Sequence, residues 1–121
     1  GVTPHQTMSR KIYIAGPMRG LPFNNYPKFD RIAAELRQKG WDVVNPTEIG
    51  ATVGTIEQLN NDEKLLNVVL YKEMSALAQC DALFLLIGWE HSEGAKAELL
   101  AALSAKLEII TEKIITPVPR P

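Results

Sequence analysis

The sequence predicts a single α/β domain, and three observations carry this prediction. Short apolar runs alternate along the chain with segments whose apolar residues recur at helical spacing. The apolar runs are bounded by glycine, proline or asparagine, as strands commonly are. The chain has 121 residues, which suffices for one hydrophobic core. Strands that alternate with helices need crossover connections, so most of the sheet is expected to be parallel.

The first half of the chain holds two expected strands and one helix. Residues 11–15 are the first strand, and residues 41–44 are the second, which ends at Asn45-Pro46. Between them, a turn-rich stretch leads into an amphipathic helix that Gly40 terminates. Residues 46–60 show no clear period, so we expect a long loop there, either a cover over a site or an ordinary surface excursion. The inward-facing residues of the helix are expected to be Phe29, Ile32, Ala33 and Leu36.

The second half repeats the alternation. Asn61 or Asp62 is expected to cap a second helix that runs to Ala78, and Ser92 is expected to cap a third. Residues 82–87 form an apolar run typical of a strand buried on both faces. Residues 107–111 are expected to be a fourth strand and residues 114–118 a short fifth one. The expected inward-facing residues are Leu65, Leu66, Val69, Met74 and Leu77 in the second helix and Ala95, Leu99, Ala102 and Leu103 in the third.

These elements predict a doubly wound, mostly parallel sheet of four or five strands with helices on both faces, of the Rossmann or flavodoxin type. We expect the strand order 2-1-3-4. In that order the crossovers after the first and third strands run in opposite directions, which leaves a crevice at the C-terminal ends of those strands. The loops that begin at Gly16 and at Gly88 both reach this crevice.

Composition excludes several classes of function. Lys and Arg (13) nearly balance Asp and Glu (14), and no basic run occurs, so a nucleic-acid partner is not expected. Residues 82–87 are the longest apolar run and are too short to span a membrane. The single cysteine, Cys80, cannot form an internal disulfide, so we expect a small core residue in a cytoplasmic protein.

Neither a metal nor a cofactor is expected, because no His, Cys and Asp residues have metal-ligand spacing. The domain is expected to span residues 8–121. Residues 1–7 precede a methionine and lack periodicity, so Met8 is the expected natural start and those residues a vector-derived remnant.

The first loop, Gly16-Pro17-Met18-Arg19-Gly20, does not match the common nucleotide fingerprints. Its glycines lack the G-x-G-x-x-G spacing, and the second strand ends in Asn45 where a ribose-binding acid would stand, so NAD is not expected. A single phosphate could bind the backbone N–H groups of this turn, with Arg19 as a charged contact. Alternatively, Arg19 is a solvated turn residue and the glycines only form the turn.

Glu98 is the candidate nucleophile. On a helix its neighbours three and four residues away are small, namely Gly94, Ala95, Ala101 and Ala102, so a ligand can approach its carboxylate. The helix start also favours the ionised form of the group. An ionised glutamate in a cleft can attack an anomeric carbon and form a glycosyl-enzyme intermediate. The alternative is an exposed charge on an amphipathic helix.

Two motifs resemble the nucleoside 2-deoxyribosyltransferase-like superfamily, and in particular its small, uncharacterised phage and bacterial branch. They are Tyr-Ile-Ala-Gly-Pro-Met-Arg-Gly at residues 13–20 and Gly-Trp-Glu-x-Ser-x-Gly-Ala-x-x-Glu, counted from Gly88, after Cys-Asp-Ala-Leu-Phe-Leu-Leu. The resemblance covers about residues 11–111 and is most specific at Ser92, Gly94 and Glu98. It implies that Glu98 attacks C1′ of the sugar and that Tyr13 orients it.

The same resemblance points to a 5′-phosphorylated substrate. Transferases of the superfamily have an aspartate six residues before the nucleophile, whereas the related deoxynucleoside 5′-monophosphate N-glycosidases have a phosphate-binding serine, as Ser92 is here. A serine at a helix N-terminus attracts a phosphate that an aspartate would repel. Ser92 is alternatively a plain helix cap.

Glu73 occupies the place of an aspartate that acts near the leaving base in relatives. A glutamate there either protonates the base or is a surface residue beside Lys72. Trp89 either stacks on the base or wedges the loop, and His91 is expected to face solvent.

The expected function is N-glycosidic bond cleavage or deoxyribosyl transfer on a (deoxy)nucleoside 5′-monophosphate. The catalytic residues would be Glu98, Tyr13 and Glu73, and the substrate-binding residues Gly16, Pro17, Met18, Arg19, Gly20, Trp89, Ser92 and Gly94. The alternatives are a non-catalytic nucleotide-binding module and a structural domain without a ligand. The resemblance further implies a homo-oligomer, a dimer above all.

Overall fold

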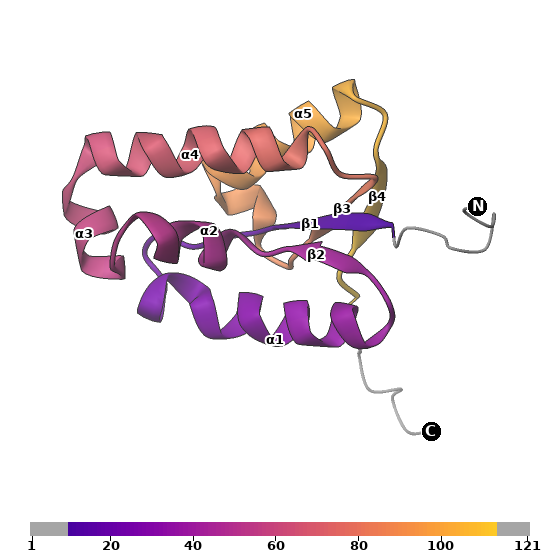
Figure 1. Cartoon of the computed structure of the whole chain (residues 1–121), viewed down its shortest axis with the longest axis horizontal. Coiled ribbons are helices and arrows are strands. Elements are labelled where there is room, and N and C mark those ends of the chain that lie inside the picture. The colour runs from indigo at the N-terminus through magenta and orange to yellow at the C-terminus, as the bar shows by residue number, and fades with distance from the viewer. Residues whose placement is uncertain (1–9, 114–121) are drawn as a thin grey trace, which may run out of the picture.

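A computed structural model describes residues 10–113, and it contains a four-stranded parallel sheet (Figure 1). The strands lie in the order β2-β1-β3-β4, and all three neighbouring pairs are parallel. This confirms the predicted α/β class and strand order. The strands are β1 (Lys11–Ala15), β2 (Asp42–Val44), β3 (Ala82–Leu85) and β4 (Glu108–Thr111).

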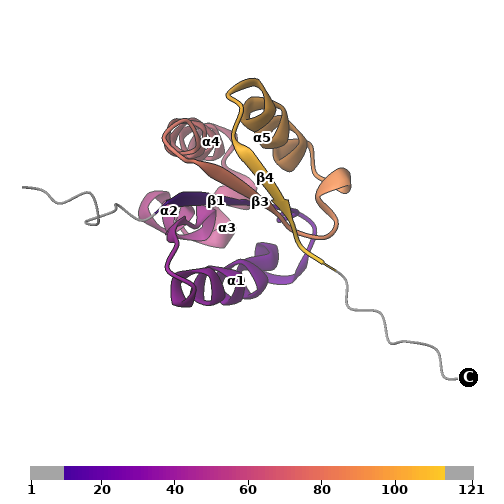
Figure 2. The same cartoon turned by 90° about the vertical axis from the view of Figure 1, so that its right-hand side faces the viewer.

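Helices cover both faces of the sheet. Seen from the end, α1 lies on one face and α4 and α5 lie on the other (Figure 2). The α2 helix contacts α1, α4 and β1, and α3 follows it toward the C-terminal ends of the strands (Figure 1). The helices are η1 (Pro22–Asn25), α1 (Tyr26–Gln38), α2 (Pro46–Val53), α3 (Ile56–Asn61), α4 (Glu63–Leu77), η2 (Trp89–His91) and α5 (Glu93–Ser104).

The predicted helix ends are confirmed where a side chain or a glycine fixes them. Asp62 caps α4 by accepting a hydrogen bond from the backbone N–H of Leu65 at 3.1 Å. Ser92 caps α5 by accepting one from the backbone N–H of Ala95, also at 3.1 Å. Gly40, which follows α1, has a φ of +96°, a conformation that only glycine adopts without strain.

The predicted loop over residues 46–60 is wrong, because this segment forms α2 and α3. The side chain of Asn45 accepts a hydrogen bond from the N–H of Thr47, and Pro46 occupies the first turn, where a missing N–H costs nothing. Thr55 and Gln58 form a reciprocal capping box that starts α3. Asn45-Pro46 therefore ends a strand and starts a helix at once.

Each face of the sheet has its own hydrophobic core. Ile12 and Ile14 of β1 pack with Phe29 and other residues of α1. On the opposite face, Tyr13 and Ala15 pack with residues of α4, β3 and α5, and the predicted core cysteine Cys80 lies among them. Alternate residues of one strand thus serve the two cores, as the pleat requires.

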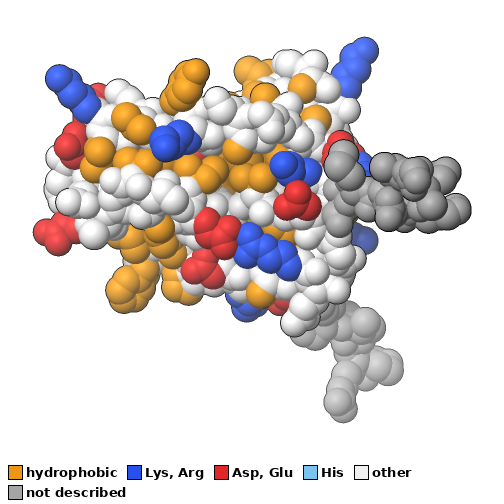
Figure 3. Space-filling model, in the orientation of Figure 1, with side chains coloured by type: hydrophobic (Ala, Val, Ile, Leu, Met, Phe, Trp, Pro, Cys, Tyr) orange, Lys and Arg blue, Asp and Glu red, His pale blue; other side chains and the backbone are white. Residues whose placement is uncertain are grey.

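Two residues expected on inner helix faces are exposed instead. Met74 of α4 is 37% exposed and Leu103 of α5 is 54% exposed. Three other apolar residues of these helices, Leu70, Tyr71 and Leu100, are exposed as well. The buried arcs of these helices centre on Glu73 and Glu98, which places the two apolar residues outside them. Figure 3 shows hydrophobic side chains protruding over α4.

Some expectations fall on other parts of the chain. The fifth strand, residues 114–118, and the remnant at residues 1–7 lie outside the described residues. None of the helices within residues 10–113 combines the length and apolar composition that crossing a bilayer requires.

Candidate functional site

The loops that follow β1 and β3 pack against each other, as the strand order predicts. A Cβ atom added to Gly16 would stand 2.7 Å from the Cβ of Leu86, so this close approach of the strand ends requires glycine. A Cβ added to Gly88 would stand 3.3 Å from the Cγ of Pro17. The backbone N–H of Leu86 donates to the carbonyl of Ala15 at 2.8 Å. The two loops therefore share one rim of the sheet.

Behind this rim, the structure brings together the three residues predicted to be catalytic. The hydroxyl of Tyr13 on β1 donates a short hydrogen bond to Oε2 of Glu98 on α5. The same hydroxyl lies 3.3 Å from Oε2 of Glu73 on α4. Tyr13 is fully buried, while Glu73 and Glu98 are 8% and 9% exposed. Neither glutamate is thus the surface charge that the sequence left as an alternative.

Burial is the main electrostatic feature of this cluster. It raises the pKa of Glu98 from 4.5 to about 8, with a further contribution from the charge of Glu73 and an opposing one from the Tyr13 hydrogen bond. Burial likewise raises the pKa of Glu73 to about 7, against the Tyr13 hydrogen bond. The helix start was expected to keep Glu98 ionised, but removal from water outweighs the helix dipole here.

One oxygen of Glu98 remains accessible. Within the described residues no side-chain hydrogen bond reaches Oε1 of Glu98, and no fully buried side-chain oxygen lacks a partner. It follows that Oε1 has contact with solvent. Of the small neighbours, Ala95 and Ala102 are buried beside Glu98, whereas Gly94 is exposed. The carboxylate is thereby held by one oxygen and free at the other.

The predicted phosphate-binding residues lie on the loops of the same rim. Arg19 and Gly20 are exposed, and Gly20 has a φ of +85°, which forms the turn. Ser92 is half-buried and caps α5, so its hydroxyl stands at the N-terminus of a twelve-residue helix. That helix end presents backbone N–H groups and the positive end of the helix dipole.

The remaining residues of the two loops are mainly structural in this state. Met18 packs against the core on the α1 face, and Trp89 packs against the core on the opposite face. This packing is consistent with Trp89 wedging its loop, and its stacking on a base stays a prediction. His91 is exposed, with 83% of its side chain in solvent, as expected.

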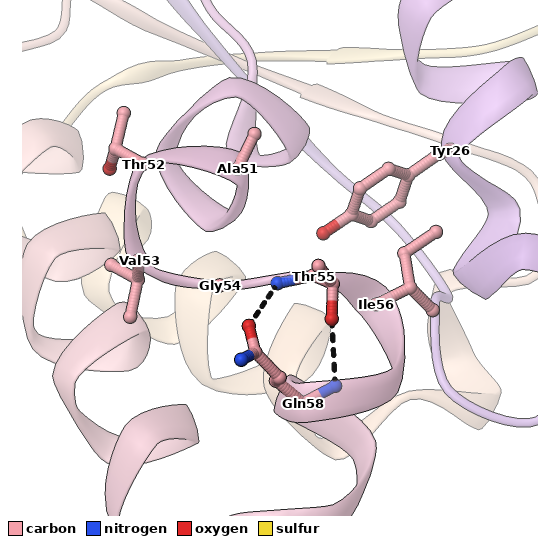
Figure 4. Close-up of a pocket in the computed structure, with 8 residues that line it drawn as sticks. All are labelled: Tyr26, Ala51, Thr52, Val53, Gly54, Thr55, Ile56 and Gln58. Atoms are coloured by element: carbon pink, nitrogen blue, oxygen red, sulfur yellow. Dashed lines mark hydrogen bonds between the residues drawn. The ribbon is translucent and has the colours of Figure 1, made fainter.

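A cavity of about 380 Å³ opens where α2, α3 and the start of α1 meet (Figure 4). The ring of Tyr26 forms one wall, and its hydroxyl points toward α2, beside Gly50 (Figure 4). Burial raises the pKa of Tyr26, and the negative charges of Glu73 and Asp30 raise it further. The sequence analysis missed Tyr26. The only signal was an aromatic residue at the start of a helix that follows a crevice loop.

No cluster of three or more potential metal ligands (His, Cys, Asp, Glu) is found within residues 10–113. In the comparisons with known proteins, a family model described as a domain of unknown function (DUF4406) matches residues 10–111. No curated protein matches the chain.

Proposed function

Since the chain belongs to the DUF4406 family, whose description assigns no activity, we propose a function from the site itself: cleavage of the N-glycosidic bond of a (deoxy)nucleoside 5′-monophosphate. The observation that carries the proposal is the contact of Tyr13 with Glu98 and Glu73 beneath the loops that begin at Gly16 and Gly88. This is the set of residues that the resemblance to nucleoside deoxyribosyltransferase-like proteins names.

Glu98 acts as the nucleophile in this proposal. Its accessible Oε1 attacks C1′ of the sugar, the bond from C1′ to the base nitrogen breaks, and the bonding electron pair leaves with the base. Water then attacks C1′ and releases the sugar phosphate, or a second base attacks and a new nucleotide forms. Tyr13 holds Oε2 through its hydroxyl, which fixes the direction of the attacking oxygen.

Arg19, Gly20 and Ser92 bind the 5′-phosphate. Arg19 supplies a guanidinium for a charged contact, and the start of α5 supplies backbone donors and a hydroxyl. The exposure of Arg19 and Gly94 at this rim supports an open phosphate subsite. Gly16, Pro17, Met18 and Trp89 shape the rim by packing.

The leaving base needs a proton, and Glu73 is the candidate donor. Burial raises its pKa to about 7, so a large share of the group is protonated near neutral pH. A neutral base is a better leaving group than its anion, which makes a poised acid useful at this step. No cofactor enters the scheme.

Incubation of the protein with each (deoxy)nucleoside 5′-monophosphate, followed by chromatography of free base, tests the proposal. We expect base release from at least one monophosphate and none with Glu98→Gln. Glu35→Gln is the matched control, because Glu35 is an exposed residue of α1 on the other face of the sheet. Equal release by wild type and Glu98→Gln would refute the assignment.

A non-catalytic nucleotide-binding module is the second candidate. The observation that favours it is the raised pKa of Glu98, because a protonated carboxyl is a poor nucleophile. This candidate predicts saturable binding of a monophosphate with no base released at any pH. Binding accompanied by base release at any pH favours the enzyme instead.

We also propose that two copies of the chain associate through α4 and α5. The exposed apolar side chains on these helices support this proposal: Leu70, Tyr71, Met74, Leu100 and Leu103. Relatives in the superfamily that the sequence resembles assemble so that a neighbouring chain completes the pocket.

A further inference from the structure

The hydroxyl of Tyr13 has more carboxyl partners than protons. A phenol carries one hydrogen, so it can donate to only one acceptor at a time. Tyr13 contacts Oε2 of Glu98 by the shorter bond and Oε2 of Glu73 at 3.3 Å. If Tyr13 donates to Glu98, the contact with Glu73 is a hydrogen bond only when Glu73 carries a proton and donates it to the phenol oxygen.

We propose that neutral Glu73 is a positioning residue: it donates to the oxygen of Tyr13 and thereby directs the Tyr13 hydroxyl to Glu98. The hydrogen bonds then form a relay that runs in one direction, from Glu73 to Tyr13 to Glu98. The single negative charge of the cluster then resides on Glu98, whose Oε2 accepts the shorter bond from Tyr13. Glu73 thus acts on Glu98 through Tyr13, in addition to its proposed role as the acid that protonates the leaving base.

The surroundings of the cluster favour a single charge. Within residues 10–113, no cation is among the groups that shift the pKa of either carboxyl, and both values are raised chiefly by burial. Tyr13 on β1 and Tyr26 on α1 are the other titratable groups coupled to Glu73. Two buried anions with one shared donor would repel each other without compensation, whereas one anion and one acid satisfy the hydroxyl.

This inference rests on the proposed function for its catalytic consequence only. The two carboxyls titrate as a coupled pair, so the first proton lost as pH rises leaves one negative charge, which the shorter hydrogen bond from Tyr13 holds on Glu98. Loss of the second proton leaves Tyr13 between two anions, and its hydroxyl no longer has a fixed direction. The rate of base release is therefore expected to rise and then fall with pH.

The decisive measurement uses the free protein, so it does not depend on any substrate. Titration of ¹³C-labelled glutamate carboxyls by NMR is compared among wild type, Glu73→Gln and Glu73→Leu. Both variants remove the same charge, but only the amide of glutamine can donate to the oxygen of Tyr13. We expect the pKa of Glu98 to fall in both, and to be lower in Glu73→Gln by roughly half a unit to one unit, the weight of one hydrogen bond.

Equal pKa values for Glu98 in the two variants would overturn the relay, because simple repulsion by Glu73 would then explain the whole effect. If Glu73→Leu does not fold, Tyr13→Phe replaces it: loss of the phenol donor should raise the pKa of Glu98, and an unchanged value would equally overturn the relay. Glu35→Gln should leave the titration of Glu98 unaltered.

The pH profile of base release provides the catalytic test. In Glu73→Gln, base release is expected to be slower, because the amide cannot protonate the leaving base, and the limb that falls at high pH is expected to disappear, since the amide cannot ionise. A relay shown by NMR without base release from any nucleotide would refute the proposed function and leave the positioning role intact. Base release, combined with equal Glu98 pKa values in Glu73→Gln and Glu73→Leu, would support the proposed function and refute the positioning role of Glu73.

Discussion

The phenol of Tyr13 on β1 donates a hydrogen bond to the carboxylate of Glu98 on α5, across a sequence separation of 85 residues. This contact joins the start of the chain to the helix after β3 and fixes one oxygen of the candidate nucleophile. The hydrogen bond lies in the interior of the protein, where a hydrogen bond to a charged group is stronger than in water.

Replacing Ser92 with aspartate is expected to separate phosphate binding from helix capping. Aspartate caps a helix as well as serine does, so the free energy of unfolding should change by less than about 1 kcal/mol. Its carboxylate would repel a 5′-phosphate, so affinity for monophosphates should fall while affinity for the corresponding nucleosides is retained or rises. Calorimetric titration with both ligands, beside Ser92→Ala, measures the difference. Equal loss of both ligands would contradict a phosphate role.

The stability of the protein is expected to decline as pH rises through neutrality because of Glu73 and Glu98. Their folded pKa values, about 7 and about 8, lie above the ordinary value of 4.5, so protons bind more tightly to the folded state. The contribution to stability is complete below pH 4.5 and is lost progressively toward pH 8. Urea unfolding across this range should show a smaller pH dependence in the double variant Glu73→Gln, Glu98→Gln than in wild type. An identical slope in both would show that the pair is not buried as described.

Replacing Gly16 with alanine is expected to destabilise the fold by about 1 to 3 kcal/mol, the usual cost of overpacking. The added methyl would stand 2.7 Å from the Cβ of Leu86, where the ends of β1 and β3 approach. Gly94→Ala is the matched control, since the nearest atom to its added methyl is 3.9 Å away and alanine favours a helix. Urea denaturation of both variants measures the contrast, and a neutral Gly16→Ala would mean that the loops are less tightly joined.

Introducing glutamate at two exposed leucines of α5 is expected to prevent self-association of the chain. Leu100 and Leu103 are 67% and 54% exposed, so a change to glutamate at both positions should leave the monomer folded. Sedimentation analysis should show a dimer for wild type and a monomer for the double variant. Lys96→Glu, an exposed change of charge on the same helix, is the control. A wild-type protein that is monomeric at high concentration would remove the proposal.

Much of the fold was predictable because its signals are local. Hydrophobic alternation located the four described strands to within one or two residues, and Asp62, Ser92 and Gly40 fixed helix ends through their own side chains or backbone. The error over residues 46–60 had a local cause as well. Asn45-Pro46 signals both the end of a strand and the first turn of a helix, and short helices such as α3 carry too few apolar positions to show a period.

The composition of the site was also accessible from sequence, but its state was not. Residue spacing and resemblance selected Tyr13, Glu73 and Glu98 as candidates. The resemblance implied that Tyr13 orients Glu98, but neither signal indicated that the same hydroxyl also contacts Glu73, because these residues are far apart along the chain. The inward faces of α4 and α5 were likewise misjudged at Met74 and Leu103, since polar glutamates occupy the centres of the buried arcs.

By itself, then, the sequence determined the four described strands, the helices α1, α4 and α5 and the residues at the ends of β1 and β3, because periodicity, capping and turn chemistry act over a few residues. Only the tertiary structure decided that two glutamates share one phenol and that burial raises the pKa of both. Those properties depend on removal from water and on distances between separate elements, and both arise when α4 and α5 pack over the same face of β1.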